Sequence, residues 1–160
     1  MKIGLDLRMA GGGSGIDRYI TELSQAILQQ DKQNQYVLFL RNAQAAESFR
    51  QYGHRIVIAD IPHYSLAEQA KLPKILEREN LDLMHFPHFN VPLRYKQPFV
   101  VTIHDLTHTL FPGRKTSHFF HRLAYRAVFN HAIRDSRSIV AVSEATKKQI
   151  LEHYLISPEK

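Results

Sequence analysis

Short apolar runs of strand length alternate with helical patterns along the whole chain, and this alternation restricts the possible folds more than any other feature. The strand-length runs lie at residues 2–7, 36–40, 55–61, 81–86, 99–104 and 138–142. Several are apolar throughout, as in YVLFL, which suits a parallel sheet covered on both faces. Six strands interleaved with helices predict an α/β fold with a Rossmann-like, doubly wound, mostly parallel sheet.

The stretches between these runs carry apolar residues at helical spacing. The first begins at residue 16, where Ile16, Ile20, Leu23 and Ile27 share one helix face. Further helices are expected at residues 43–52, 66–80, 117–133 and 144–155, and Pro73 is expected to break the second of these into two pieces. The length of 160 residues is that of a single domain, and we find no linker or internal repeat.

Composition excludes several classes of protein. The chain has no cysteine, which excludes disulfide scaffolds, thiolate zinc sites and thiol nucleophiles. Hydrophobic residues make up 44% and charged residues 22%, which is typical of a globular domain. The sequence has no apolar run of membrane-spanning length and no signal-peptide pattern, so we expect a cytoplasmic protein.

Positive charge is concentrated at one end of the chain. Of the net charge of +6, residues 114–160 supply +5, because they hold nine basic and four acidic residues. A local basic excess favours a phosphate-bearing partner such as nucleic acid, an anionic lipid surface or a phosphorylated substrate. A solvated, solubilising surface explains the same charge equally well.

A glycine cluster, residues 11–15 (GGGSG), lies between the first expected strand and the first helix. Such a turn exposes backbone N–H groups and the positive end of the helix dipole, which together favour anions. The spacing does not fit the dinucleotide fingerprint, because Arg18 stands where the third glycine belongs, and it does not fit the P-loop either. NAD and ATP are therefore disfavoured. A looser anion or sugar-phosphate contact and a turn without any ligand both remain open.

The dipeptide His104-Asp105 follows the apolar run FVVTI. Ligands of open α/β sheets bind beyond the carboxyl ends of the strands, so both side chains are candidates for a binding crevice. An imidazole there can donate to a hydroxyl or phosphate, or accept a proton near neutral pH. It can also simply cap the strand. A metal site with His108, or with His85 and His88, is disfavoured because no carboxylate completes a ligand set.

Four collinear segments together resemble the N-terminal half of a family 4 glycosyltransferase with the GT-B fold. They are KIGLDLRMAGGGSGIDRYITEL, LDLMHFPHFNVPL, VVTIHDLTHTLFP and SIVAVSEATKKQILEHY. The resemblance implies a retaining enzyme that transfers a sugar from a nucleotide-sugar donor to an acceptor, such as a polysaccharide or a lipid-linked glycan. It also implies that neither a metal nor another cofactor is needed.

The resemblance assigns roles to individual residues. His104 is expected to be catalytic through contact with the donor sugar, and the adjacent Asp105 to shape that loop. The other residues that it assigns to substrate or phosphate binding are Gly12, Gly13, Ser14, Gly15, Arg18, His85, Pro87 and Asn90. Within this set Gly12–Gly15 would lie against the donor diphosphate and the acceptor. His85, Pro87 and Asn90 match the loop after the fourth strand, which would line the acceptor side. For Arg18 a purely structural role remains open.

The donor-binding half of such an enzyme is missing from this sequence. We therefore expect residues 1–160 to be the acceptor-binding N-terminal domain, and to be inactive without a C-terminal donor domain. Glu144 and Glu152 have the separation of the family's glutamate pair. That pair belongs to the second domain, so we interpret Glu144 as a residue that favours a helix start.

The expected helix at residues 117–133 combines aromatic with basic residues. Lys115, Arg122 and Arg126 are candidates for contact with an anionic membrane surface. Many family members act on lipid-linked acceptors, so the resemblance favours a protein peripheral to the inner membrane. The alternative is that the apolar side of the helix packs on the sheet and the bases are solvated. A nucleic-acid partner is disfavoured because no recognition motif is present.

Three other functions remain open. The chain can be a non-catalytic sugar- or phosphate-binding module that pairs with a separate donor-domain protein, a phosphate-binding or hydrolase Rossmann domain, or a membrane-peripheral partner. The transferase hypothesis requires that the first and fifth strands end on one side of a common crevice. It fails if His104 lies far from the glycine loop.

Overall fold

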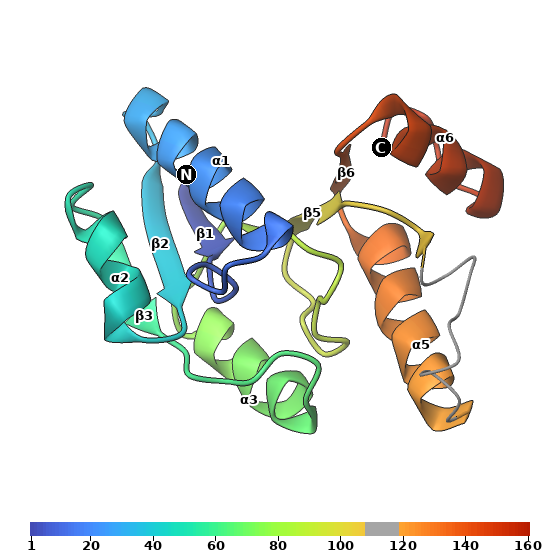
Figure 1. Ribbon diagram of the computed structural model, residues 1–160, viewed down its shortest axis with the longest axis horizontal. Helices are drawn as coiled ribbons and strands as arrows, with labels where there is room; N and C mark the ends of the chain where they lie inside the picture. The colour runs from blue at the N-terminus through green and yellow to red at the C-terminus, as the bar shows by residue number, and fades with distance from the viewer. Residues whose placement is uncertain (108–118) are drawn as a thin grey trace.

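The computed structural model describes residues 1–107 and 119–160 and contains all six expected strands (Figure 1). The strands are β1 (Lys2–Asp6), β2 (Gln35–Leu40), β3 (Arg55–Ile58), β4 (Leu83–Phe86), β5 (Phe99–Ile103) and β6 (Ser138–Ala141). The helices are α1 (Gly15–Gln30), α2 (Ala43–Arg50), α3 (Leu66–Glu77), α5 (Phe119–Asp135) and α6 (Glu144–His153).

All neighbouring strands pair in parallel, in the order β3-β2-β1-β4-β5-β6. This confirms the expected α/β, Rossmann-like architecture. The strand order reverses beside β1, which pairs with β2 on one side and with β4 on the other. In open α/β sheets a crevice forms at such a reversal, beyond the carboxyl ends of the strands. The fold therefore places a crevice between the loops that follow β1 and β4.

Helices cover both faces of the sheet, as the continuous apolar runs predict (Figure 1). On one face α1 and α2 bury Ile20, Leu28 and Phe49 against β1 and β2. On the other face α3, α5 and α6 contribute Leu72, Phe129 and Ile150 to a second buried cluster, which also contains residues of β4 and β5. Gly4 is needed where β1 passes β4, because a Cβ there would lie 2.5 Å from the Met84 sulfur.

Two details of the helices differ from expectation. Pro73 does not break its helix: α3 continues through it as one element. A proline removes one backbone donor, and the burial of Leu72 and Leu76 around it keeps the remaining turns on the sheet. The buried face of α1 is formed by Ile20, Ser24 and Leu28 rather than being centred on Leu23, which is only partly buried.

Candidate functional site

The glycine loop before α1 is held in place by Asp17. Gly11 and Gly13 have φ angles of 86° and 72°, which only glycine adopts without strain. Their N–H groups both donate to the Asp17 carboxylate at 2.7 Å, while Ser14 caps α1 by accepting the Asp17 N–H. The hydrogen bonds, that from Gly11 first, lower the pKa of Asp17 below its ordinary value. The Asp17 carboxylate therefore already accepts two backbone N–H groups of this loop that a bound anion could otherwise use.

The outer side of the loop is open. Gly12, Gly13, Ser14 and Gly15 are all exposed, and a Cβ at Gly13 or Gly15 would meet nothing within 4 Å. Nothing in the fold therefore requires glycine at position 15, whereas Gly13 needs its φ angle. Arg18 is also exposed and takes part in no ion pair with the described residues. The loop keeps room for a ligand on its solvent side.

His104 lies at the end of β5 and packs against α1. The Tyr19 ring, one turn into α1, meets the imidazole edge-on with the two centroids 4.8 Å apart. On another side, His104 Nε2 lies 2.9 Å from the carbonyl oxygen of Pro87, in the loop after β4. The loops after β4 and β5 and the helix that the glycine loop opens therefore meet around His104. His104 thus contacts a side chain one helical turn after the glycine loop, and β4 stands between β1 and β5 in the sheet.

The contact with Pro87 determines which nitrogen of His104 is available. A carbonyl oxygen only accepts hydrogen bonds, so Nε2 carries a proton and donates a hydrogen bond to the Pro87 carbonyl oxygen. In the neutral ring Nδ1 is then unprotonated and accepts hydrogen bonds. A neutral His104 can accept from a substrate hydroxyl, but it can donate to a phosphate only after it is protonated.

Asp105 is exposed and shapes the loop that follows His104. Its Oδ1 accepts the N–H of Thr107 at 2.8 Å, which closes a short turn. From α6, the Thr146 hydroxyl donates to the His104 carbonyl at 3.1 Å. The backbone at His104 is thus fixed from both its own loop and α6.

His85 lies within β4 rather than in the loop after it. Its Nε2 is 3.0 Å from the Thr102 hydroxyl of β5, and that hydroxyl is 3.3 Å from the hydroxyl of Tyr19. Burial lowers the pKa of His85 to about 4, so the ring is neutral at physiological pH. In this position His85 supports Tyr19, and through it His104, from behind the crevice.

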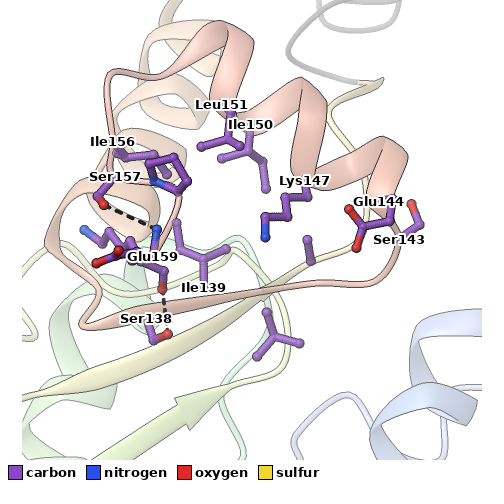
Figure 2. A pocket seen from close by; sticks show the side chains of 14 residues that line it. Ser138, Ile139, Ser143, Glu144, Lys147, Ile150, Leu151, Ile156, Ser157 and Glu159 are labelled. Carbon is purple, nitrogen blue, oxygen red and sulfur yellow. Dashed lines mark hydrogen bonds between the residues drawn. The ribbon is translucent and has the colours of Figure 1, made fainter.

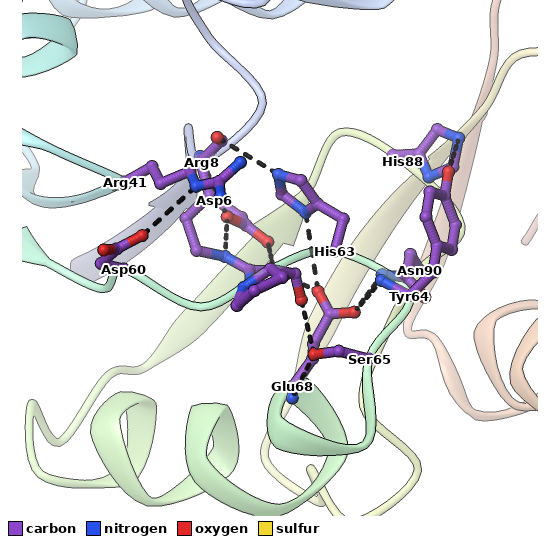
Figure 3. A network of polar contacts seen from close by, with 11 residues as sticks. Asp6, Arg8, Arg41, Asp60, His63, Tyr64, Ser65, Glu68, His88 and Asn90 are labelled. Atoms are coloured by element: carbon purple, nitrogen blue, oxygen red, sulfur yellow. Dashed lines mark hydrogen bonds and ion pairs between the residues drawn. The ribbon is translucent and has the colours of Figure 1, made fainter.

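Asn90 belongs to a buried network of charged groups beneath the crevice (Figure 3). Arg8, after β1, donates to Asp6 and, at 2.8 Å, to Glu68 at the start of α3. Asn90 Nδ2 donates to the other oxygen of Glu68. Arg8 and Glu68 are 2% and 0% exposed, so the central ion pair of the network is buried. It ties together three segments that border the crevice.

The charges in this network stabilise one another against the cost of burial. Burial by itself would raise the pKa values of Asp6 and Glu68. At Asp6 the positive charge and hydrogen bonds of Arg8 outweigh burial, and at Glu68 the hydrogen bond with His63, followed by the charge and hydrogen bond of Arg8, does so. Both carboxyl pKa values therefore lie below their ordinary values. The pKa of Arg8 is raised, because its two carboxylate partners outweigh burial. All three groups are charged at neutral pH.

The sequence did not identify several residues that the structure brings to the crevice. The ring centroid of His88 lies 6.0 Å from that of His104. From the sequence we considered His88 only as a metal ligand and disfavoured that role. Tyr19 and Tyr64 carried no sequence signal, because an aromatic residue in a helix or turn is common. Asp17 did carry one: it stands three residues after Ser14, the spacing of a capping motif.

Of the predicted membrane-facing bases, Arg122 and Arg126 are exposed on α5, next to Leu123, which is 56% exposed. Lys115 lies outside the described residues. No helix in the described part of the chain is long and apolar enough to cross a membrane. Likewise, residues 1–107 and 119–160 contain no group of three histidine, aspartate or glutamate side chains placed to hold a metal ion.

A second hollow lies apart from this crevice, between α6 and the edge strand β6 (Figure 2). It has a volume of about 440 Å³ and is closed at one end by residues 156–160. There the Ser138 hydroxyl donates to the carbonyl of Lys160 at 2.6 Å. None of the predicted site residues lines it.

The contacts at the start of α6 support the interpretation of Glu144 as a residue that favours a helix start. Ser143 caps α6 by accepting the Thr146 N–H at 3.1 Å, and Glu144 stands in the first turn. Glu152 is half exposed and lies 3.8 Å from Lys148. Both carboxylates are explained by the helix itself.

Comparison with known proteins agrees with this geometry. Residues 13–160, which include the end of the glycine loop and His104, match the sequence profile of Glycosyltransferase Family 4. No curated protein matches the chain. With a family match over nearly the whole sequence, on a Rossmann-like sheet with a crevice at its strand reversal, the chain belongs to glycosyltransferase family 4.

Proposed function

We propose that this chain is the acceptor-binding N-terminal domain of a retaining glycosyltransferase, which transfers a sugar from a nucleotide-sugar donor to a glycan or lipid-linked acceptor. The observation that carries the proposal is the convergence of three segments around His104: α1 with its glycine loop, the loop after β4 and the loop after β5. Family membership supports the reaction class. The facing donor-binding half is proposed to come from a C-terminal domain outside these residues.

The proposed chemistry is front-face transfer, in which the acceptor hydroxyl attacks on the side from which the nucleotide diphosphate leaves. The domain contributes positioning and electrostatic stabilisation rather than a covalent intermediate. Nδ1 of His104 accepts a hydrogen bond from a sugar hydroxyl and so orients the donor sugar. The open side of Gly12–Gly15 leaves the backbone accessible to the diphosphate.

The experiment that tests this role replaces His104 in the protein that carries both domains. His104→Gln keeps an N–H that can donate to Pro87 but removes the nitrogen that faces substrate, whereas His104→Ala removes both. Loss of one hydrogen bond to the reacting sugar should lower kcat by about tenfold to a hundredfold in His104→Gln, with stability unchanged. Nucleotide release from a panel of UDP- and GDP-sugars measures the rate.

The matched control is His153→Gln, because His153 is exposed at the end of α6 and its Nδ1 lies 2.9 Å from the Gln149 carbonyl oxygen of the same helix. It should leave the rate unchanged. Transfer by His104→Gln at the wild-type rate contradicts the proposed role of the imidazole. The isolated 160-residue chain should release no nucleotide, and sugar transfer by that chain alone contradicts the division of labour between the domains.

A second contact is proposed for α5. Arg122, Leu123 and Arg126 present two positive charges and an apolar side chain on one exposed stretch. This combination suits the surface of an anionic membrane, where each base contributes about 1 kcal/mol. Such contact would bring the crevice to lipid-linked acceptors.

Vesicle co-sedimentation checks the membrane contact. Arg122→Gln/Arg126→Gln should bind phosphatidylglycerol vesicles about tenfold to thirtyfold less than the wild type, since two charges are removed. Arg41→Gln/Arg50→Gln removes two exposed bases whose carboxylate partners, Asp60 and Glu47, are also exposed, and this variant should bind as the wild type does. Equal loss in both double variants would indicate attraction by net charge alone.

A further inference from the structure

The turn before α3 holds an exposed tyrosine in a strained backbone conformation. Tyr64 is 63% exposed and has a φ angle of 57°. In the described part of the chain only one other non-glycine residue, Asn80, has a positive φ. Asparagine tolerates this conformation, but an aromatic residue rarely adopts it. Strain of this kind persists only where the surroundings enforce it, and it concentrates at functional sites.

The buried charge network enforces this conformation (Figure 3). The Tyr64 N–H donates to Glu68 Oε2 at 2.8 Å, and Glu68 is itself held by Arg8 and Asn90. A buried ion pair contributes little net stability compared with apolar packing. What this network does provide is a fixed position for the turn, and with it for the exposed Tyr64 ring.

The ring stands at the outer end of a row of aromatic rings that leads to His104. The Tyr64 centroid is 6.0 Å from that of His88, and the His88 centroid is 6.0 Å from that of His104. Phe89 flanks Tyr64 at 6.2 Å. Tyr64 is thus two ring-to-ring steps from the imidazole, too far to touch the reacting atoms but within reach of the same ligand.

The surroundings of the ring suit a sugar. A pyranose offers an apolar C–H face that stacks on a flat aromatic surface and hydroxyl groups around its rim that need hydrogen-bond partners. Tyr64 supplies the surface and a hydroxyl, which lies 3.5 Å from His88 Nε2. A tyrosine hydroxyl keeps its proton at neutral pH and can therefore donate a hydrogen bond to a sugar. A hydrocarbon chain would leave these polar groups unpaired.

We propose that Tyr64 is an acceptor-binding residue, on whose ring stacks a sugar unit of the acceptor that lies beyond the one receiving the transferred sugar. This inference rests on the proposed function, since it takes His104 as the reaction centre. It implies that the acceptor is a glycan of at least two sugar units. It also makes Tyr64 a determinant of acceptor specificity rather than a catalytic residue.

The test is binding of the complete 160-residue chain to an array of printed oligosaccharides. Tyr64→Ala should bind the recognised glycan at least about tenfold more weakly, the loss typical of one well-packed aromatic contact. Tyr64→Phe keeps the ring and should stay within about threefold of the wild type. Leu66→Ala removes a side chain that is 88% exposed in the same turn and is the matched control, with unchanged binding.

Tyr64→Gly separates the ring from the backbone. Glycine accepts the positive φ, so this variant should be at least as stable as the wild type and yet bind as weakly as Tyr64→Ala. A wild-type chain that binds no oligosaccharide, or a Tyr64→Ala chain that binds as the wild type does, overturns the proposal. A ring-dependent affinity for polyprenyl-phosphate vesicles in place of oligosaccharides also overturns it.

The array distinguishes this proposal from the transferase proposal, because binding requires no transfer. Glycan binding through Tyr64 without sugar transfer by the two-domain protein would contradict the transferase and leave the Tyr64 site standing. If the two-domain protein transfers sugar and the KM for its glycan acceptor is unchanged in Tyr64→Ala, the Tyr64 site is contradicted and the transferase proposal stands. The expected result is a raised acceptor KM with kcat within about threefold of the wild type.

Discussion

Gly15 is a glycine that the fold itself does not require. It is the first residue of α1, its φ angle is not in the left-handed region, and a Cβ would meet nothing within 4 Å. Gly13, two residues earlier, needs its φ of 72°. Substitution of Gly13 therefore tests the need for its backbone conformation, whereas substitution of Gly15 tests whether a ligand approaches the loop.

Gly15→Ala should leave the free energy of unfolding unchanged or raise it by up to about 1 kcal/mol, because alanine favours the helix. If the loop lies against the donor diphosphate, the added methyl group should weaken nucleotide-sugar binding at the same time. Denaturant titration and calorimetry on the two-domain protein measure the two quantities. Gly13→Ala is the contrast and should lose roughly 1 kcal/mol of stability from backbone strain. Unchanged binding in Gly15→Ala would remove the loop from the donor site.

At the same scale, Asp17 is a carboxylate placed where a phosphate would be favourable. Asp17→Asn removes its negative charge and keeps one oxygen, which can accept the N–H of Gly11 or of Gly13 but not both, because these two groups bind different carboxylate oxygens. A diphosphate near this loop should then bind more tightly, because repulsion by the carboxylate is gone. Calorimetric titration with UDP should show a lower Kd at low salt. A Kd that does not change would indicate that the diphosphate lies elsewhere.

At the scale of elements, the buried network joins the end of β1, the start of α3 and the loop after β4. Arg8 is its centre, since it bonds both Asp6 and Glu68, whose charges would otherwise be uncompensated in the interior. The elements around the crevice are therefore held by directional bonds as well as by apolar packing. Loss of Arg8 should affect all three segments together.

Arg8→Met should lower the free energy of unfolding by roughly 3–5 kcal/mol, the usual cost of leaving buried charges without their partner. Urea denaturation at pH 7 measures the loss. The control is Arg41→Met, which breaks the exposed pair with Asp60 and should cost no more than about 1 kcal/mol. Similar small losses in both variants would mean that water reaches Asp6 and Glu68.

At the scale of the whole molecule, two buried histidines make folding depend on pH. The pKa values of His85 and His88 are lowered to about 4, in both cases by burial first and for His88 also by the nearby His104 and His63. The ordinary value is 6.5, so between pH 6.5 and 4 the unfolded chain binds protons that the folded chain does not. Stability from these groups is complete above pH 6.5 and is lost as the pH falls toward 4.

The expected slope is a loss of at most roughly 1.4 kcal/mol per pH unit for each histidine in that window. Urea denaturation between pH 7.5 and pH 4 should show it, and His85→Gln and His88→Gln should each flatten the profile. His153→Gln, at an exposed position, should not. A wild-type profile that is flat over this range would contradict the neutral, buried state of both rings.

Local patterns in the sequence predicted the number, order and type of the elements, because strand and helix periodicities are properties of a few consecutive residues. The helix start at Glu144 and the glycine turn before α1 were predicted for the same reason. The predicted break at Pro73 was wrong, because packing of the whole helix on the sheet outweighed one lost donor. His104 was predicted as a site residue from its position at a strand end, because ligands bind at that edge of parallel sheets.

The tertiary structure alone decided which of these residues meet. Strand order places β4 between β1 and β5. Long-range packing brings Arg8 to Glu68, which is 60 positions away, and His104 Nε2 to the carbonyl oxygen of Pro87. A periodicity reports which side of an element is apolar, but not which element it faces. The sequence by itself therefore determined the family and the architecture, and the folded chain determined the partners of each side chain in the crevice.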